Sequence, residues 1–291
     1  MIRLDIATVL LQWATGGLLF LWVTTRRREV GLGYGWLLRV TFGALAALAL
    51  VTGRALEPVP IRELASAGVV VATAVALVVS IVRRGAGVSG VRAEEVRRAE
   101  RVAAMTRTGG PAASGADAAP AQRPAPPEFP PVLDLVAPVI GVVGLVAAAL
   151  DAGGSPALAL LRTLVGAAFL GAVTDAMLLG HWYLVQPGMA RKPLLELVRW
   201  LTVIWPFEVL ALLLPIGMLS VLSGSIADGY NGLLGWFWVA CAVATIVLCV
   251  VTRAALRERY YSAVMAATGL LYLAILTAFG TDLVARAVLA G

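Results

Sequence analysis

Long apolar runs, separated by short polar segments, follow one another through most of the chain. A helix needs about 20 apolar residues to cross the hydrocarbon core of a bilayer. Eight runs come near or exceed that length, and they cover residues 4–23, 36–52, 64–82, 132–150, 157–185, 194–222, 233–252 and 260–283. The pattern predicts an all-α fold: a polytopic helical membrane protein with about eight transmembrane helices.

The composition narrows the class of protein further. Of the 291 residues, 60% are hydrophobic and 14% are charged, whereas soluble domains carry about 25% charged residues. This excludes a water-soluble enzyme, a disordered protein and a secreted disulfide scaffold. The net charge is +6, but the basic residues lie at the ends of the apolar runs. We therefore expect a lipid bilayer as partner, and no nucleic acid.

The distribution of basic residues predicts the orientation of the chain. Sixteen of the 23 lie in the loops that follow odd-numbered runs, and four lie on the opposite side. Arginine and lysine accumulate in cytoplasmic loops, so both termini should lie outside. Lys192 is the only lysine. We connect this bias with a GC-rich bacterial genome and expect a multi-pass protein of the bacterial cytoplasmic (inner) membrane.

One long cytoplasmic loop divides the predicted helices into two groups. Residues 91–107 have the charge spacing of a solvated helix, and residues 108–131 are rich in proline and alanine, which is typical of a disordered linker. The expected organisation is a three-helix membrane bundle at 1–82, a cytoplasmic segment at 83–131 and a five-helix membrane bundle at 132–291.

Ionisable and aromatic residues gather where the fifth run ends and the sixth begins. Ionisable groups inside a membrane are costly, so each is a candidate functional residue. An antiparallel hairpin folded near residue 190 would place His181 level with Arg199. The sequence thus predicts a ligand pocket in the inner leaflet, formed by Asp175, His181, Trp182, Tyr183, Glu196 and Arg199.

This predicted pocket suits an amphipathic ligand. Arg199 would hold an anionic group, His181 would exchange protons near neutral pH, and Asp175 would accept hydrogen bonds. The aromatic rings would stack on a quinone-like ring or flank a lipid tail. An ion-pair network that merely fixes the hairpin explains the same residues equally well.

Glu208 in the sixth run is a second candidate, as a proton or ion site together with Asp175. It lies between Pro206 and Pro215, and each proline frees the carbonyl four residues before it. A carboxylate beside broken helix bonding is typical of ion and proton sites. The alternative is a protonated glutamic acid bonded to a neighbouring helix. In the fifth run, Arg162 is expected to extend toward the membrane surface.

A short motif suggests an inverted repeat, which is common in transporters. Residues 37–39 and 160–162 both read Leu-Leu-Arg, and each is followed at the same spacing by Gly-Ala. In runs so rich in leucine, alanine and glycine, chance explains such a match better.

The sequence lacks the residues that several activities require. A single histidine excludes a bis-histidine haem within one chain, no cluster has the ligand spacing of a zinc site, and no phosphate-binding loop is present. We predict neither catalytic nor metal-binding residues.

Three functions remain open. The first is a non-catalytic or accessory membrane component of a respiratory or assembly complex, with membrane protein partners and a quinone-like or lipid ligand in the pocket. The second is a small proton- or ion-coupled secondary transporter. The third is a membrane-embedded lipid-processing enzyme.

Overall fold

The computed structural model describes residues 5–93, 96–97, 100, 127–186, 189–258 and 260–290. Most of the expected cytoplasmic helix at 91–107 and of the linker at 108–131 lies outside these residues. The regular elements are all helical, as the hydrophobic pattern predicts: α1 (Ile6–Thr25), α2 (Leu32–Ala55), α3 (Pro60–Val82), the 3-10 turn η1 (Arg83–Ala86), α5 (Leu133–Asp151), α6 (Pro156–Val185), α7 (Lys192–Leu213), α8 (Gly217–Leu222), α9 (Leu233–Ala255) and α10 (Tyr261–Ala290).

Seven of these helices are long and apolar enough to cross a membrane: α1, α2, α3, α5, α6, α9 and α10. The prediction of several membrane-spanning helices is confirmed, whereas the number eight stays a prediction. The difference lies in the sixth apolar run. This run is not one helix but α7 followed by the short α8, because Pro215 interrupts the helix. In addition, α7 carries more charged residues than the seven apolar helices.

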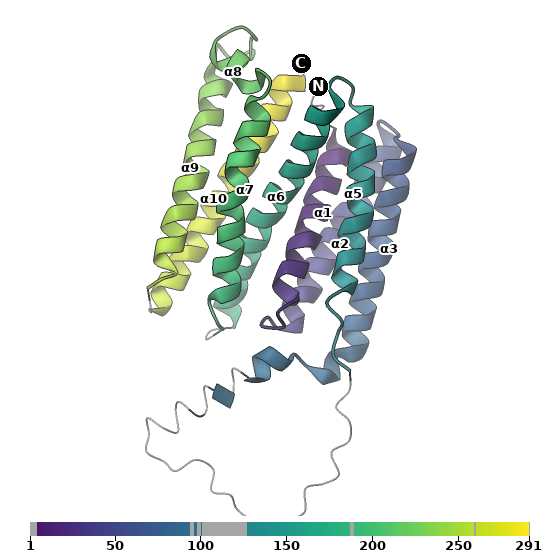
Figure 1. Cartoon of the computed structure of the whole chain (residues 1–291), viewed down its shortest axis with the longest axis vertical. Coiled ribbons are helices and arrows are strands. Elements are labelled where there is room, and N and C mark those ends of the chain that lie inside the picture. The colour runs from purple at the N-terminus through teal and green to yellow at the C-terminus, as the bar shows by residue number, and fades with distance from the viewer. Residues whose placement is uncertain are drawn as a thin grey trace, which may run out of the picture.

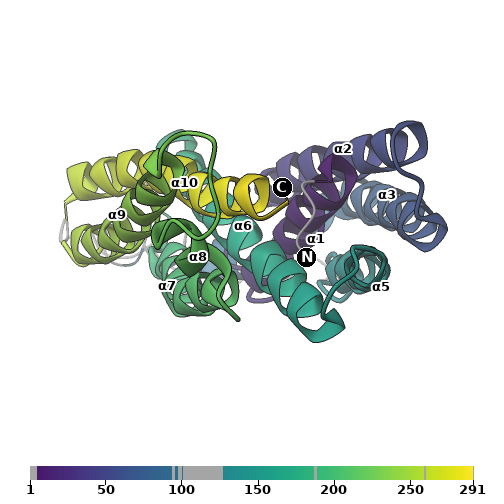
Figure 2. The same cartoon turned by 90° about the horizontal axis from the view of Figure 1, so that it is seen from above.

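The helices form two groups that lie side by side (Figures 1 and 2). One group contains α1, α2, α3 and α5, and the other contains α6 to α10. Although α5 follows the long loop, it packs against α3 and α1 more extensively than against α6. Packing therefore groups α5 with the first three helices, whereas the order of the chain places it with the later ones.

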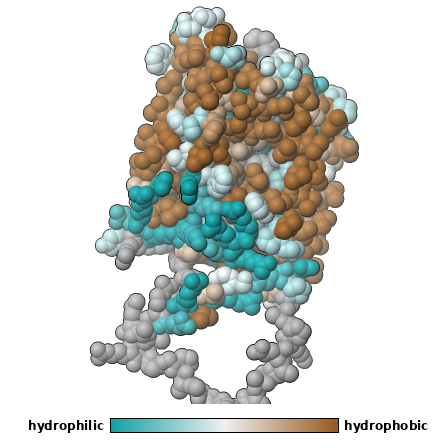
Figure 3. Space-filling model, in the orientation of Figure 1, coloured by the Kyte–Doolittle hydropathy of each residue, from teal (hydrophilic) through white to brown (hydrophobic). Residues whose placement is uncertain are grey.

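Both termini lie at the end of the bundle that also carries α8 (Figure 1). In the face that Figure 3 shows, hydrophobic residues cover most of the height and hydrophilic residues gather at the other end. A buried ion pair at that other end joins α2 to α5. Arg39 donates to Asp134 through Nε at 2.9 Å and Nη2 at 2.8 Å, and Thr25 adds a third hydrogen bond to the same carboxylate.

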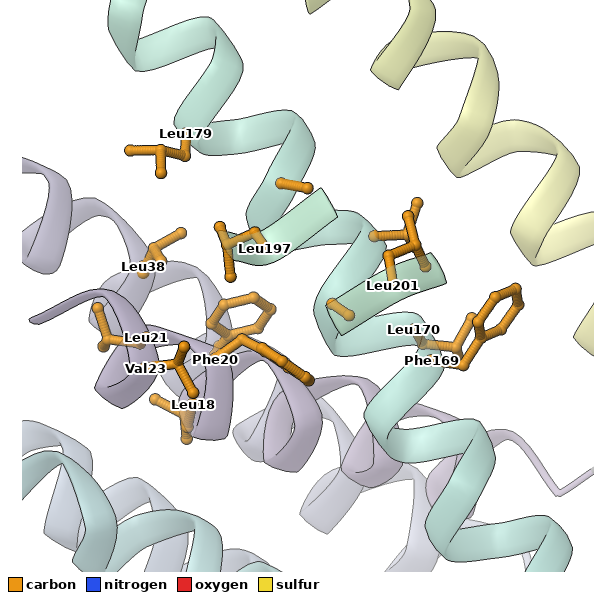
Figure 4. Packing of buried hydrophobic residues seen from close by; sticks show 14 of the residues in the cluster. Leu18, Phe20, Leu21, Val23, Leu38, Phe169, Leu170, Leu179, Leu197 and Leu201 are labelled. Carbon is orange, nitrogen blue, oxygen red and sulfur yellow. The ribbon is translucent and has the colours of Figure 1, made fainter. Parts of the chain in front are cut away.

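The two groups of helices meet mainly where α1 packs against α6. Gly16 and Gly171 face each other so closely that a Cβ added to Gly171 would lie 2.6 Å from the Cα of Gly16. Small residues at such crossings let two helix backbones approach. Around this contact, leucine, valine and phenylalanine side chains of α1, α2, α6 and α7 form a continuous buried cluster (Figure 4).

We expect Gly171→Ala to lower the thermal unfolding temperature of the detergent-solubilised protein. A methyl group there forces the helices apart, and overpacking costs about 1–3 kcal/mol. Gly269→Ala in α10 is the matched control, because apart from its chain neighbours and the adjacent backbone of α10 no described atom lies within 4 Å of its added Cβ. If both variants unfold at the same temperature, the close crossing of α1 and α6 is contradicted.

Candidate functional site

The side chains of the predicted inner pocket do not meet. His181 is exposed, and its Nδ1 shares a hydrogen bond of 3.0 Å with the hydroxyl of Tyr272 in α10. Glu196 instead pairs with Arg26 at 2.6 Å and with Arg27 at 3.0 Å, at the end of α1. Arg199 is exposed and has no hydrogen bond or ion pair within the described residues.

The remaining members of the predicted pocket also have separate surroundings. Asp175 is completely buried, and neither of its carboxylate oxygens has a partner among the described residues. Trp182 donates to Gln186 at 3.1 Å, and the Tyr183 hydroxyl donates to the carbonyl of Ala190. The residues of the predicted pocket do lie at similar depths along the hairpin of α6 and α7. Asp175 and His181, however, are six residues apart, and this turns their side chains about 240° from each other around the helix axis.

A different group of polar side chains comes together in the other half of the bundle, toward the termini. We call it the polar cluster. Its members come from α1, α6, α7 and α10, and each is 5% exposed or less. They are Gln12, Arg162, Glu208, Asp282 and Arg286.

Arg162 holds the polar cluster to the break between α7 and α8. Pro215 has no N–H to donate to the carbonyl of Ala211, and Arg162 fills that role with its Nε at 3.0 Å. Its Nη2 also donates to the carbonyl of Leu214 at 2.6 Å. The expectation that Arg162 extends to the membrane surface is therefore wrong. Two unpaired carbonyls at the negative end of α7 attract the guanidinium inward.

Glu208 and Asp282 form a carboxyl pair. Their carboxyl groups interact electrostatically, although no hydrogen bond joins them within the described chain. Two neighbouring carboxylates repel each other unless one of them binds a proton. Arg286 donates from Nε to Asp282 at 2.7 Å. Arg162 and Arg286 both interact electrostatically with Glu208. Two cations therefore interact with this carboxyl pair.

Several buried polar atoms of the cluster have no hydrogen-bond partner within the described chain. They are Gln12 Oε1, Asp282 Oδ1, both carboxylate oxygens of Glu208, and Arg286 Nη2. Unsatisfied buried groups are costly and rare. Their concentration in one place therefore indicates that water, an ion or a ligand belongs there.

Gly166 lies at the centre of the cluster, where polar side chains surround it closely. A Cβ added to it would lie 3.0 Å from Arg286 Nη2, 3.1 Å from Gln12 Nε2 and 3.2 Å from Asp282 Oδ1. Any larger residue would reach the unpartnered atoms. Beside it, Gln12 is oriented by donating to the carbonyl of Thr163 at 2.6 Å.

A pocket reaches this region from the end of the bundle that carries the termini. Its empty volume is about 460 Å³, including the open mouth. Arg286 and Thr163 lie inside their helices and form its floor, whereas Asp5, Glu57 and Asp151 lie at helix ends and form its rim. The polar cluster is thus connected to one surface of the molecule.

Sequence reasoning identified Glu208 but missed its partners. Asp282 and Arg286 stand four residues apart in the last helix, a spacing that brings side chains together, but the hydrophobic pattern predicts that the last apolar run ends at residue 283. Gln12 was one polar residue in an apolar run. Within the described residues, no group of three or more His, Cys, Asp and Glu side chains is placed to hold a metal ion.

No protein-family model, no curated protein and no solved structure matches this chain. The geometry of the polar cluster therefore has to carry the functional argument.

We expect Arg162→Lys to destabilise the protein by about 1.5–3 kcal/mol, because a lysine amine cannot bond both carbonyls as the planar guanidinium does. Thermal unfolding in detergent measures this loss. Arg199→Lys makes the same exchange at an exposed position and should leave the unfolding temperature unchanged. Equal effects of the two variants would contradict the role assigned to Arg162.

Proposed function

We propose that this protein is a small proton-coupled secondary transporter in which the Glu208–Asp282 pair binds the transported proton. The observation that carries the proposal is this carboxyl pair itself. It is buried among apolar helices near two arginines, next to a break between α7 and α8. Interrupted helices and buried ionisable groups are typical of transporter sites.

The proposed topology has eight crossings, with α7 as the eighth spanning helix and both termini outside. Two features support it. The termini lie at the same end of the bundle (Figure 1), which requires an even number of crossings. The arginine-rich loops follow the odd-numbered spans, the arrangement of cytoplasmic loops. We place the protein in a bacterial cytoplasmic membrane, so the pocket opens to the outside.

Proton exchange changes the charge of the cluster. With both carboxyl groups ionised, Arg162 and Arg286 are balanced, and with one proton bound the cluster carries one positive charge. When the proton leaves, Glu208 competes with the carbonyls of Ala211 and Leu214 for Arg162. The bonds that hold the α7–α8 break therefore depend on the proton, and the break is the element we expect to move.

Asp175 is a second proton carrier on the same path. It lies about 13 Å further along α6 than Gly166, toward the arginine-rich end. Its unpartnered carboxyl group is completely buried. In this mechanism the proton passes from the carboxyl pair to Asp175 before it reaches the cytoplasm.

The other two hypotheses stay predictions. An accessory component with a quinone-like or lipid ligand rests on the inner pocket, whose side chains do not meet. A lipid-processing enzyme needs a nucleophile next to a base, and hydroxyls placed in this way, such as Tyr272 beside His181, lie outside the polar cluster.

The first test uses liposomes that contain the purified protein and the pH dye pyranine, with the outside more acidic. Amino acids, monocarboxylates, amines and sugars are added in turn. We expect at least one class to change the lumenal pH beyond the change in protein-free liposomes, and Glu208→Gln to abolish this effect because it removes the proton site.

Glu196→Gln is the matched control, since Glu196 pairs with Arg26 and Arg27 outside the cluster. It should retain the pH change. Infrared spectroscopy adds a readout that needs no substrate: the C=O band of protonated carboxyl groups should lose intensity in Glu208→Gln. If no class of solute moves protons, or if Glu208→Gln behaves like the parent protein, the proposed function is wrong.

A further inference from the structure

The pocket that reaches the polar cluster presents opposite charges at two depths. At its floor, Arg286 has an Nη2 without a hydrogen-bond partner among the described residues and is 1% exposed. At its rim, Asp151 is exposed and pairs with none of the described residues. A donor inside and a carboxylate outside are the two ends of a binding site for a dipolar molecule.

The other charged groups of the pocket are already engaged. Arg62 donates to Asp5, to the hydroxyl of Thr8 at 3.1 Å, to Glu63 at 2.9 Å and to the carbonyl of Glu57 at 2.6 Å. Its guanidinium is saturated. Arg286 is therefore the cation of this pocket that can accept an anionic group, while Asp151 is available to a cationic one.

We propose that this pocket binds a small zwitterion of the α-amino-acid type, with its carboxylate on Arg286 Nη2 and its ammonium group toward Asp151. The inference rests on the proposed function and names the substrate class of the same site. An arginine donates favourably to a carboxylate. An anion without an ammonium group would meet the acidic rim unpaired, and a simple amine would meet the cationic floor.

Ligand and proton should bind together. Arg286 divides its donors between Asp282 and the ligand carboxylate, so a bound ligand weakens the ion pair that favours ionised Asp282. Four ionisable groups face one another here: Arg162 of α6, Glu208 of α7, and Asp282 and Arg286 of α10. The neighbouring α1 contributes the neutral Gln12, α8 has no ionisable residue, and α9 approaches α10 with Cys241 beside Gly280. Binding of the ligand carboxylate therefore favours retention of the shared proton.

Gly166 lies beside the donor that the ligand carboxylate would use. A methyl group there would lie against Arg286 Nη2, the donor assigned to the ligand. Gly166→Ala should therefore weaken ligand binding without changing any charge of the cluster.

Three probes with one carbon skeleton test the assignment: L-alanine, propionate and ethylamine. Each is titrated calorimetrically into the full-length protein in lipid nanodiscs. We expect L-alanine to bind at least about tenfold more tightly than propionate or ethylamine, because each of those lacks one of the two charge-assisted contacts. Binding of L-alanine should also take up protons, which measurements in buffers of different ionisation enthalpy detect.

Two substitutions locate the site. Asp151→Asn should weaken L-alanine binding about tenfold and leave propionate unaffected or improved, because only the ammonium contact is lost. Glu258→Gln, an equal change of charge at the exposed opposite end of the bundle, is its control. Gly166→Ala should weaken L-alanine and propionate alike, and Gly269→Ala, which is not close to other described atoms, should weaken neither.

The outcomes separate this inference from the proposed function. Propionate or ethylamine binding as tightly as L-alanine, or an Asp151→Asn variant that binds L-alanine normally, overturns the zwitterion assignment. The transporter proposal survives that result if another solute class still moves protons through Glu208. Tight binding of L-alanine supports the pocket even if neither L-alanine nor any other class of solute moves protons across liposomes, the result that overturns the transporter.

Discussion

The close crossing of α1 and α6 is the contact on which the rest of the structure depends. α1 meets the second group of helices mainly through α6, and only two facing glycines, Gly16 and Gly171, allow the backbones to touch. One turn away along α1, Gln12 reaches the carbonyl of Thr163. The next residue of α1, Trp13, donates to Thr174, which follows Gly171 in α6. The same crossing therefore sets the spacing of the helices around the polar cluster.

Polar groups are distributed unequally along this axis. Toward the arginine-rich end, two ion-pair groups join helices, Arg39 with Asp134 and Glu196 with Arg26 and Arg27, whereas Asp175 is unpartnered. Toward the termini, the cluster contains unpartnered atoms and a pocket that leads to them. Paired charges hold helices together, whereas unpaired ones are available for binding.

The sequence predicts the helices well because apolar length is a property of each segment alone. It also points to Glu208, since a carboxylate between two prolines is unusual wherever it packs. The sequence does not predict that the side chains of the inner pocket lie apart. The hairpin gives the depth of each residue in the membrane, but not the direction in which its side chain leaves the helix. The sequence also misses Asp282 and Arg286, whose importance arises only when α10 packs against α6.

Arg162 has a consequence for how related sequences would vary. Its guanidinium binds the main-chain oxygens of residues 211 and 214, and a main-chain oxygen is the same whatever side chain the residue carries. Substitutions at those two positions can therefore accumulate without loss of the contact. An evolutionary record of this junction would consist of a fixed arginine and a fixed proline 53 residues later, with no compensating partner to reveal that they act together.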